Sequence, residues 1–200
     1  GSTGFASGLW WIKDIANTNQ HQFVDNVTNA LVNSGNVANT SPTINQAAAQ
    51  AYVAPAGNSV GWCWNSTDPD NSGFNIVTYT GNRPNDQVIN HGLPGAPDMI
   101  ITQPVSGTTR NYAVYHSGLA NPPGQFLQIN GSDAATNSTE LWANTAPNAT
   151  SFSVGDANTT NFAGAVFTAY CWTAISGYSA FGSYVGNNND NGPFIYTGFT

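Results

Sequence analysis

The sequence predicts an all-β fold: an antiparallel, jelly-roll-like β-sandwich built from two pseudo-repeated halves. The first observation is composition, since only 6% of the 200 residues are charged, 21 are Gly, and Asn, Thr and Ser are abundant. These residues favour strands and tight turns over helices. The second observation is a series of short apolar runs separated by turn residues. The third is a set of motifs that occurs twice along the chain.

The first half of the chain carries three predicted strands. Leu9–Lys13 is an aromatic and β-branched run, and Ser59–Asn65 alternates bulky and small side chains. In Phe74–Thr80, the side chains at even-numbered positions (Phe, Ile, Thr) alternate with those at odd-numbered positions (Asn, Val, Tyr). Alternation with a period of two residues is typical of a strand. Ile44–Tyr52 is the one plausible helical turn of this half, and its polar composition fits a loop equally well.

Five further strands are expected in the second half of the chain. They lie at Asp98–Gln103, Asn111–Ser117, Gln125–Asn130, Ser151–Gly155 and Ala165–Thr173. Clusters of Gly, Asn, Pro and Ser separate the predicted strands. Short strands at this spacing, joined by such turns, indicate a sandwich or a barrel.

Internal repetition supports two related halves. Gly61-Trp62-Cys63-Trp64 is matched by Ala169-Tyr170-Cys171-Trp172, and Tyr79-Thr80-Gly81-Asn82 is matched by Tyr184-Val185-Gly186-Asn187. A repeated sequence indicates a repeated structural unit. Because the halves are unequal in length, we expect them to share one core rather than to fold separately.

A third motif marks where each unit starts. Thr3-Gly4-Phe5 and His91-Gly92-Leu93 each precede an apolar run, and Thr197-Gly198-Phe199 lies one residue before the end of the sequence. We therefore expect a single β-rich domain over residues 1–200. It would hold a first half-repeat at about 1–72, a second at about 73–180 and the start of a further repeat at 181–200. Residue 1 is Gly and the one Met is Met99, so the chain is expected to be processed or part of a longer protein.

Charge excludes two classes of partner. The chain has three basic residues and ten acidic ones, for a formal net charge of −7. Nucleic-acid binding requires a basic surface, and membrane-surface binding requires a polybasic patch. No apolar run reaches the roughly 18 residues that a spanning helix needs. We expect no nucleic-acid partner and no membrane insertion.

The two cysteines, Cys63 and Cys171, occupy equivalent positions in the two halves, each beside Trp. Alternation along a strand places Cys63 on one face and its flanking Trp side chains on the other. Two interpretations remain open: a disulfide that joins the halves, or two buried thiols that pack as small apolar side chains. Neither Cys belongs to a pattern with metal-ligand spacing, so no metal site is expected.

Aromatic residues suggest two kinds of contact. Adjacent Trp10 and Trp11 must point to opposite faces of their strand, so both faces require apolar cover, from a central position in the sheet or from an interface. We expect an interface around Trp10, Trp11 and the C-terminal residues Phe194, Tyr196 and Phe199. Trp142, in a Thr- and Asn-rich stretch, is the best candidate for an exposed aromatic that contacts a glycan.

Catalytic patterns are weak in this sequence. Glu140 is the single Glu, so paired acids for glycoside cleavage have few candidates. Asp68 and Asp70 resemble the front half of a calcium loop, but Tyr79 stands where the closing acid would lie. The three histidines are scattered and no nucleophile-elbow spacing occurs. We expect no catalytic residue, cofactor or metal, and hence no enzyme.

Several motifs in order resemble one known family. They are GFNIVTYTGN (73–82), HGLPGAPDMII (91–101), NYAVYHSGL (111–119), AYCWTAISGYSAFGSYVGN (169–187), NGPFIYTGF (191–199) and the N-terminal TGFASGLWWIKD. The chain resembles an uncharacterised repeat domain of structural proteins of tailed bacteriophages, often marine, including predicted tail-fibre proteins. The resemblance covers most of the chain and is weakest across Thr28–Gly57. That family commonly shows a basic tail after the Trp-Ile-Lys strand, whereas here Asp14 follows Lys13.

The resemblance implies a structural component of a virion surface assembly, a fibre or another appendage or decoration, and hence an extracellular location. Its expected partners are further copies of the same chain, other virion proteins and, where it contacts the host, a surface glycan. The alternative is a lectin-like carbohydrate-binding module for receptor recognition. A glycan-cleaving enzyme is a third hypothesis, which the shortage of acids disfavours. No catalytic or binding residues are established for the family, so the resemblance assigns none.

Overall fold

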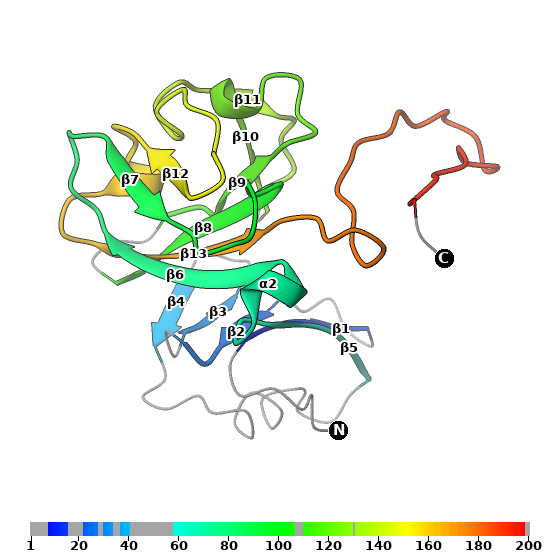
Figure 1. Cartoon of the computed structure of the whole chain (residues 1–200), viewed down its shortest axis with the longest axis horizontal. Helices are drawn as coiled ribbons and strands as arrows, with labels where there is room; N and C mark the ends of the chain where they lie inside the picture. The colour runs from blue at the N-terminus through cyan, green and yellow to red at the C-terminus, as the bar shows by residue number, and fades with distance from the viewer. Residues whose placement is uncertain are drawn as a thin grey trace.

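The computed structural model describes residues 8–15, 22–27, 30–33, 37–40, 58–106, 110–129 and 131–198. Within these ranges almost all regular structure is β, and every strand pair is antiparallel (Figure 1). The strands form two large sheets and one strand pair. The coarse prediction is confirmed: the protein is mostly β, with antiparallel sheets consistent with a β-sandwich.

The N-terminal sheet has five strands in the order β4-β3-β2-β1-β5. They are β1 (Gly8–Asp14), β2 (Gln22–Asp25), β3 (Ala30–Asn33), β4 (Val37–Thr40) and β5 (Ser59–Asn65). The observed bounds of β5 are the predicted ones. Because β1 lies between β2 and β5, it is an interior strand, and the side chains on its two faces are largely buried, with Trp10 on one face and Leu9 on the other.

The C-terminal sheet has six strands in the order β11-β10-β9-β8-β13-β6. They are β6 (Phe74–Thr80), β8 (Met99–Ser106), β9 (Ala113–His116), β10 (Gln125–Gln128), β11 (Thr136–Asn137) and β13 (Val166–Trp172). The predicted bounds of β6 also match those observed. The other strands expected in the second half are present with ends shifted by a few residues, whereas β11 was not expected.

A strand pair and three short helical turns complete the described elements. The pair joins β7 (Gln87–Asn90) and β12 (Ser151–Val154), and the turns are α2 (Pro69–Ser72), α3 (Asn158–Asn161) and the 3-10 turn η1 (Pro122–Gly124). The segment around Asp68 and Asp70, which resembles the front half of a calcium loop in sequence, contains α2. Proline at the first position starts this helical turn, and Gly73 ends it in the left-handed conformation at φ 63°. The possible helical turn at Ile44–Tyr52 lies outside the described residues.

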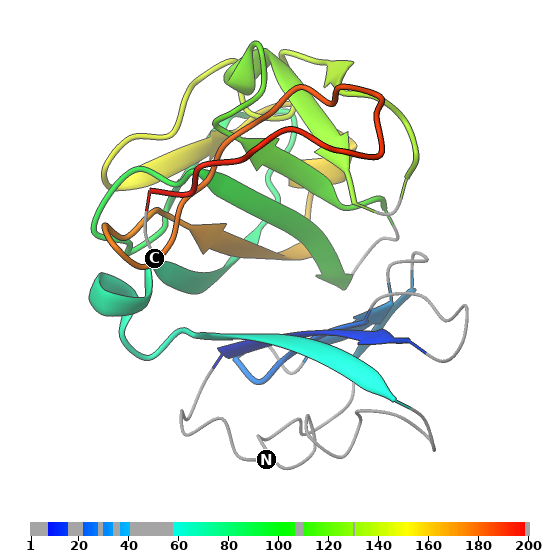
Figure 2. The same ribbon diagram turned by 90° about the vertical axis from the view of Figure 1, so that its right-hand side faces the viewer.

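An apolar layer joins the two large sheets, which face each other (Figure 2). Leu9 and Phe23 come from the N-terminal sheet, and most of the remaining buried members come from the C-terminal sheet. Aromatic rings span the layer, with centroids 5.5 Å apart for Trp64 and Trp172 and 5.7 Å apart for Phe23 and Tyr112. Such pairs add to the free energy gained by burying their surface. We call this layer the inter-sheet core.

A buried polar contact also joins the sheets. The Tyr170 hydroxyl on β13 donates to Asp25 Oδ2 on β2 at 2.8 Å, and it accepts from Gln103 Nε2 at 3.0 Å. All three side chains are buried. Burial first, and then the charge of Asp25, raise the pKa of Tyr170 well above its ordinary value of 10, so the hydroxyl remains a donor at neutral pH.

A second core lies on the other face of the C-terminal sheet. Phe167 and Cys171 of β13 point into it, whereas Tyr170 and Trp172 point into the inter-sheet core, as alternation along a strand requires. The pair β7–β12 covers this side through Ile89, Phe152 and Val154. The C-terminal sheet is therefore buried on both faces.

Candidate functional site

Trp11, Trp62 and Trp64 form a row on the inner face of the N-terminal sheet. The centroid of the Trp11 ring lies 5.8 Å from that of Trp62 and 6.3 Å from that of Trp64. Trp64 is half-buried against the inter-sheet core, whereas Trp62 remains 46% exposed. The row therefore runs from the core to the open surface of β5.

The structure places Trp10 and Trp11, two of the expected interface residues, inside the chain. Trp10 is buried and lies opposite Cys63 in the register of β1 and β5, while Trp11 is half-buried and stacks on Phe23 at 4.9 Å. The apolar cover that these two residues require is thus supplied within the domain.

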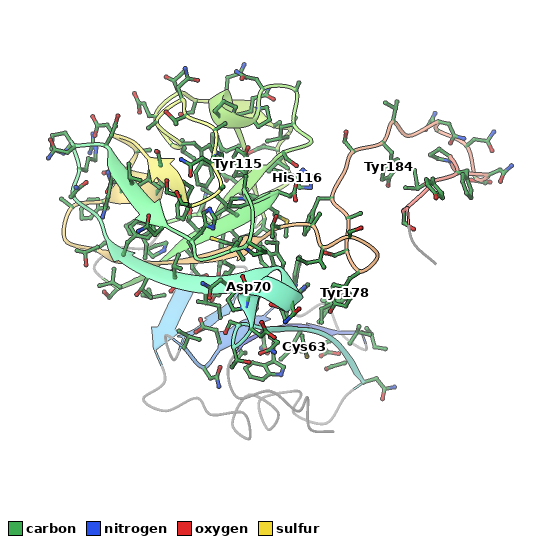
Figure 3. The ribbon with its side chains drawn as sticks, in the orientation of Figure 1. Cys63, Asp70, Tyr115, His116, Tyr178 and Tyr184 are labelled. Carbon is green, nitrogen blue, oxygen red and sulfur yellow. The ribbon has the colours of Figure 1, made fainter. Side chains whose placement is uncertain are left out.

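The C-terminal residues of the expected interface lie on an exposed segment. Residues 173–198 form no strand, and Phe194 and Tyr196 are 89% and 81% exposed. Tyr178 and Tyr184 in the same segment are also exposed, and Figure 3 shows Tyr184 where the segment projects away from the sheets. Phe199 lies outside the described residues.

The two cysteines are free thiols. Each lies on the face of its own sheet that is turned away from the other sheet. Cys171 is buried in the second core, on the face of the C-terminal sheet opposite to the N-terminal sheet. Cys63 is exposed, and alternation with Trp62 and Trp64 places it on the outer face of β5. The disulfide is therefore absent, and the interpretation as buried thiols holds for Cys171 and is wrong for Cys63.

The expected exposure of Trp142 is wrong. Its side chain is 1% exposed and meets the Tyr115 ring edge-on, with centroids 5.8 Å apart. The backbone holds it there, because Gly155 N and the Thr160 hydroxyl both donate to the Leu141 carbonyl oxygen, at 3.2 and 3.1 Å. A buried indole offers no face for a glycan. The exposed indole of the described chain is Trp62.

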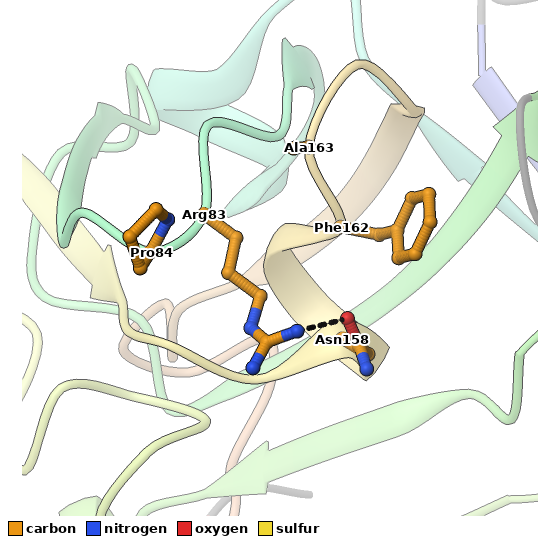
Figure 4. Close-up of a pocket in the computed structure, with 5 residues that line it drawn as sticks. All are labelled: Arg83, Pro84, Asn158, Phe162 and Ala163. Carbon is orange, nitrogen blue, oxygen red and sulfur yellow. Dashed lines mark hydrogen bonds between the residues drawn. The ribbon is translucent and has the colours of Figure 1, made fainter.

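A small hollow lies beside α3. Its volume is about 230 Å³, and it is lined by Arg83, Pro84, Asn158, Phe162 and Ala163 (Figure 4). Arg83 pairs through Nε with Asp156 and donates from Nη1 to Asn158 Oδ1 at 2.8 Å. The charge of Arg83 is thereby balanced, which suits the hollow to a neutral polar group better than to an anion.

Two of the three histidines lie in the described ranges. His91 is buried: its Nδ1 accepts from Leu93 N at 3.0 Å, and its Nε2 lies 3.0 Å from the Asn148 carbonyl oxygen. Burial lowers the pKa of His91, more than the contact with Asn148 raises it. His116 is half-buried beside Phe181, with ring centroids 6.2 Å apart. His91 thus has a structural role.

No three His, Cys, Asp or Glu side chains in the described part of the chain gather closely enough to hold a metal ion. Asp68 Oδ2 instead accepts from Asn71 Nδ2 at 2.8 Å. None of the helices described there has the length and apolar character to cross a membrane.

The strongest candidate site is the outer edge of β5. In the part of the chain that the structure describes, β5 pairs with β1 alone, and its residues Val60 and Trp62 are 40% and 46% exposed. An unpaired strand edge with apolar side chains is a template for another strand. Sequence reasoning identified Trp62 as part of a repeat but did not place it at an edge, because pairing partners depend on the tertiary fold.

These features define a class: a β-rich protein of antiparallel sheets whose exposed aromatic residues lie on one strand edge and on its C-terminal segment. The chain belongs to the family described as a domain of unknown function, DUF7483, which matches residues 1–200. No curated protein and no solved structure matches the chain.

Proposed function

We propose that this chain is a structural, self-associating component of a phage virion surface assembly, a fibre or another appendage. The observation that carries the proposal is the placement of its exposed apolar side chains. Most of them lie on β5 and on the C-terminal segment, which includes Tyr178, Tyr184, Phe194 and Tyr196. Contiguous exposed apolar surface marks a site of protein contact. The motif resemblance to phage structural repeats supplies the virion context and the extracellular location.

The proposal includes a duplicated fold. The N-terminal sheet has the order β4-β3-β2-β1-β5, and five strands of the C-terminal sheet have the corresponding order β11-β10-β9-β8-β13. In each sheet a four-strand meander is followed by a strand that returns beside its first strand. This is a Greek-key connection, the element from which a jelly roll is built. The equal order supports two half-repeats that share one domain.

The register supports the same duplication. On β1 and β5, Trp10 lies opposite Cys63 and Trp11 lies opposite Trp62. On β8 and β13, Ile100 lies opposite Cys171 and Ile101 lies opposite Tyr170. The residues that match in sequence therefore hold matching positions in the two pairs. Corresponding faces of the two sheets also meet in the inter-sheet core.

Sedimentation velocity of the full chain tests self-association. We expect the sedimentation coefficient to rise with concentration, and we expect Trp62→Lys to weaken association by about tenfold or more, because a charge on an edge strand opposes pairing. Val88→Lys is the matched control, since Val88 is an exposed apolar residue on a different strand. A wild-type chain that stays monomeric at all concentrations would contradict the proposal.

Mass spectrometry of purified phage particles tests the virion location. The particles would come from a phage that encodes this chain. The proposal expects the chain as a stoichiometric surface component that is accessible to external protease. Its absence from the particles would exclude a virion role and leave self-association to be judged separately.

A second candidate function is carbohydrate binding, which the hollow beside α3 favours. Asn158 supplies a polar amide and Phe162 an aromatic ring, groups that suit a neutral sugar. A glycan array of the full chain, with Asn158→Ala as the comparison, tests it. Binding that Asn158→Ala abolishes supports host contact through this hollow, whereas an array without signal rejects it. Neither proposal includes catalysis, a cofactor, nucleic acid or membrane insertion.

A further inference from the structure

We propose that the C-terminal segment of a second copy of this domain adds to the N-terminal sheet as an antiparallel strand, with residues 178–185 along the outer edge of β5. The inference rests on the proposed self-association and names the two surfaces that carry it. Strand addition of this kind gains main-chain hydrogen bonds for affinity and side-chain contacts for specificity.

The first argument is an unfilled position in the N-terminal sheet. In the C-terminal sheet, β13 has β8 on one side and β6 on the other. In the N-terminal sheet, β5 takes the place of β13 and β1 takes the place of β8. Within the described ranges no strand takes the place of β6 beside β5. The missing strand would complete the correspondence between the two sheets.

The second argument identifies the strand that fits this position. β6 follows β5 in the chain, and the segment after β13 repeats its sequence: Tyr79–Asn82 is matched by Tyr184–Asn187. Ser72-Gly73-Phe74 at the start of β6 is likewise matched by Ser176-Gly177-Tyr178. Gly73 and Gly177 are both left-handed, with φ of 63° and 76°. The C-terminal segment therefore carries a motif from each end of β6, with one more residue between them, since five residues separate Gly73 from Tyr79 and six separate Gly177 from Tyr184.

The third argument is the exposure that pairing would remove. Tyr170, the equivalent of Trp62, lies opposite Ile76 of β6 and is fully buried. Trp62 is 46% exposed, and in the C-terminal segment Tyr184 is 69% exposed. In the register set by Tyr79 and Tyr184, Phe181 takes the place of Ile76 and would lie opposite Trp62, while Tyr184 takes the place of Tyr79 and would lie opposite Ser59. Pairing would therefore cover Trp62 through Phe181.

The occupant is a second copy because this chain directs its own segment elsewhere. Phe181 packs beside His116, and the backbone of Gly182 lies close to Gly118 in the turn after β9. Beyond this contact the segment projects away from both sheets (Figure 1). After β5 the chain likewise leaves the N-terminal sheet, and its next strand, β6, pairs in the C-terminal sheet. The segment that follows the C-terminal sheet is thus expected to reach the N-terminal sheet of another copy, and Phe181 must then leave His116.

The register can be carried over from the existing pair. Asn75 of β6 lies opposite Cys171 of β13. Aligned on Tyr79 and Tyr184, with the extra residue of the segment placed at Tyr178, residue 180 takes the place of Asn75, so Ala180 of one copy would lie opposite Cys63 of the next. Directly opposed residues in an antiparallel pair are close enough for a disulfide. The native Cys63 thiol is exposed and serves as the reporter, while Cys171 is buried.

The experiment is cysteine cross-linking of the full chain carrying Ala180→Cys. Under mild oxidation we expect covalent oligomers joined between positions 63 and 180, located by peptide mass spectrometry and proved intermolecular by mixing isotopically labelled and unlabelled chains. Tyr184→Cys is the register control, because position 184 lies about 13 Å farther along the strand. We expect at least about tenfold less cross-linking to Cys63 from position 184, since proximity sets the effective concentration.

The outcomes separate this inference from the proposed function. Adding Cys63→Ser to Ala180→Cys should abolish the 63–180 link. Equal linking from positions 180 and 184, a 63–180 link within one chain, or no link in a sample that sedimentation shows to be associated would each overturn the strand addition. The last result would leave self-association standing.

Discussion

Replacing Tyr170 with Phe should weaken the contact between the two sheets. The change removes one hydroxyl from the inter-sheet core without altering the ring. Asp25 Oδ2 then loses a donor at 2.8 Å, and Gln103 Nε2 loses an acceptor at 3.0 Å. Both side chains are buried, so water does not replace the lost partner.

The size of the effect follows from these two groups. Leaving a buried polar group without its partner costs about 1–3 kcal/mol, and more where the group is charged, so we expect the free energy of unfolding to fall by about 2–4 kcal/mol. Asp25 keeps its contact with Val27 N, which limits the loss. For a chain of this length, that loss corresponds to a fall in Tm of about 5–15 °C.

Denaturant unfolding followed by Trp fluorescence measures this change. Tyr178→Phe removes a hydroxyl from an exposed ring and is the matched control, with an expected effect within about 0.5 kcal/mol. In the background of Asp25→Asn, Tyr170→Phe should lower the free energy of unfolding by about 1 kcal/mol less than in the wild type. The reason is that this background has no buried carboxylate that the substitution would leave without its donor. A loss below about 0.5 kcal/mol for Tyr170→Phe in the wild-type background would refute the role of this contact.

Three further predictions follow from local geometry. In the native chain one thiol, Cys63, should react with a maleimide, and Cys171 should react only after unfolding; modification of both native thiols would contradict the assigned burial. Gly81→Ala should destabilise by about 1–3 kcal/mol in a denaturant titration, because its Cβ would lie 2.2 Å from a backbone oxygen, whereas Gly61→Ala, with its nearest atom at 4.0 Å, should be nearly neutral. The pKa of His91 is lower in the folded chain than its ordinary 6.5, so the unfolded chain binds the proton more readily and stability should fall as pH drops below about 6.5. His91→Asn should flatten that dependence between pH 7.5 and 5.5, and an unchanged slope would show that another group is responsible.

The sequence predicted the strands that carry a clear side-chain alternation. β5 and β6 were predicted with their observed bounds, because each has alternating side chains and flanking turn residues. β7 was missed, since its four residues include just two apolar side chains and its pairing with β12 is what defines it as a strand. Short strands such as β2 and β3 were missed for the same reason, because neighbouring strands in the sheet, and not local propensity, stabilise them.

The candidate site was predictable in part. Repetition linked Trp62 to Tyr170 and Cys63 to Cys171, and in the structure Cys63 lies opposite Trp10 while Cys171 lies opposite Ile100. Exposure was not predictable from composition: Trp142 lies in a polar stretch yet is buried, because hydrogen bonds from Gly155 N and the Thr160 hydroxyl to the Leu141 carbonyl oxygen hold its loop against the second core. The orientation of the thiols was also beyond the sequence, since it depends on which face of each sheet meets the other.

A density map of the self-associated protein at side-chain resolution tests the central claim most directly. We expect the Tyr178–Val185 segment of one copy to run antiparallel along β5 of its neighbour, with the Trp62 indole covered. A map in which the outer edge of β5 faces solvent, or in which copies meet through the C-terminal sheet instead, would contradict it.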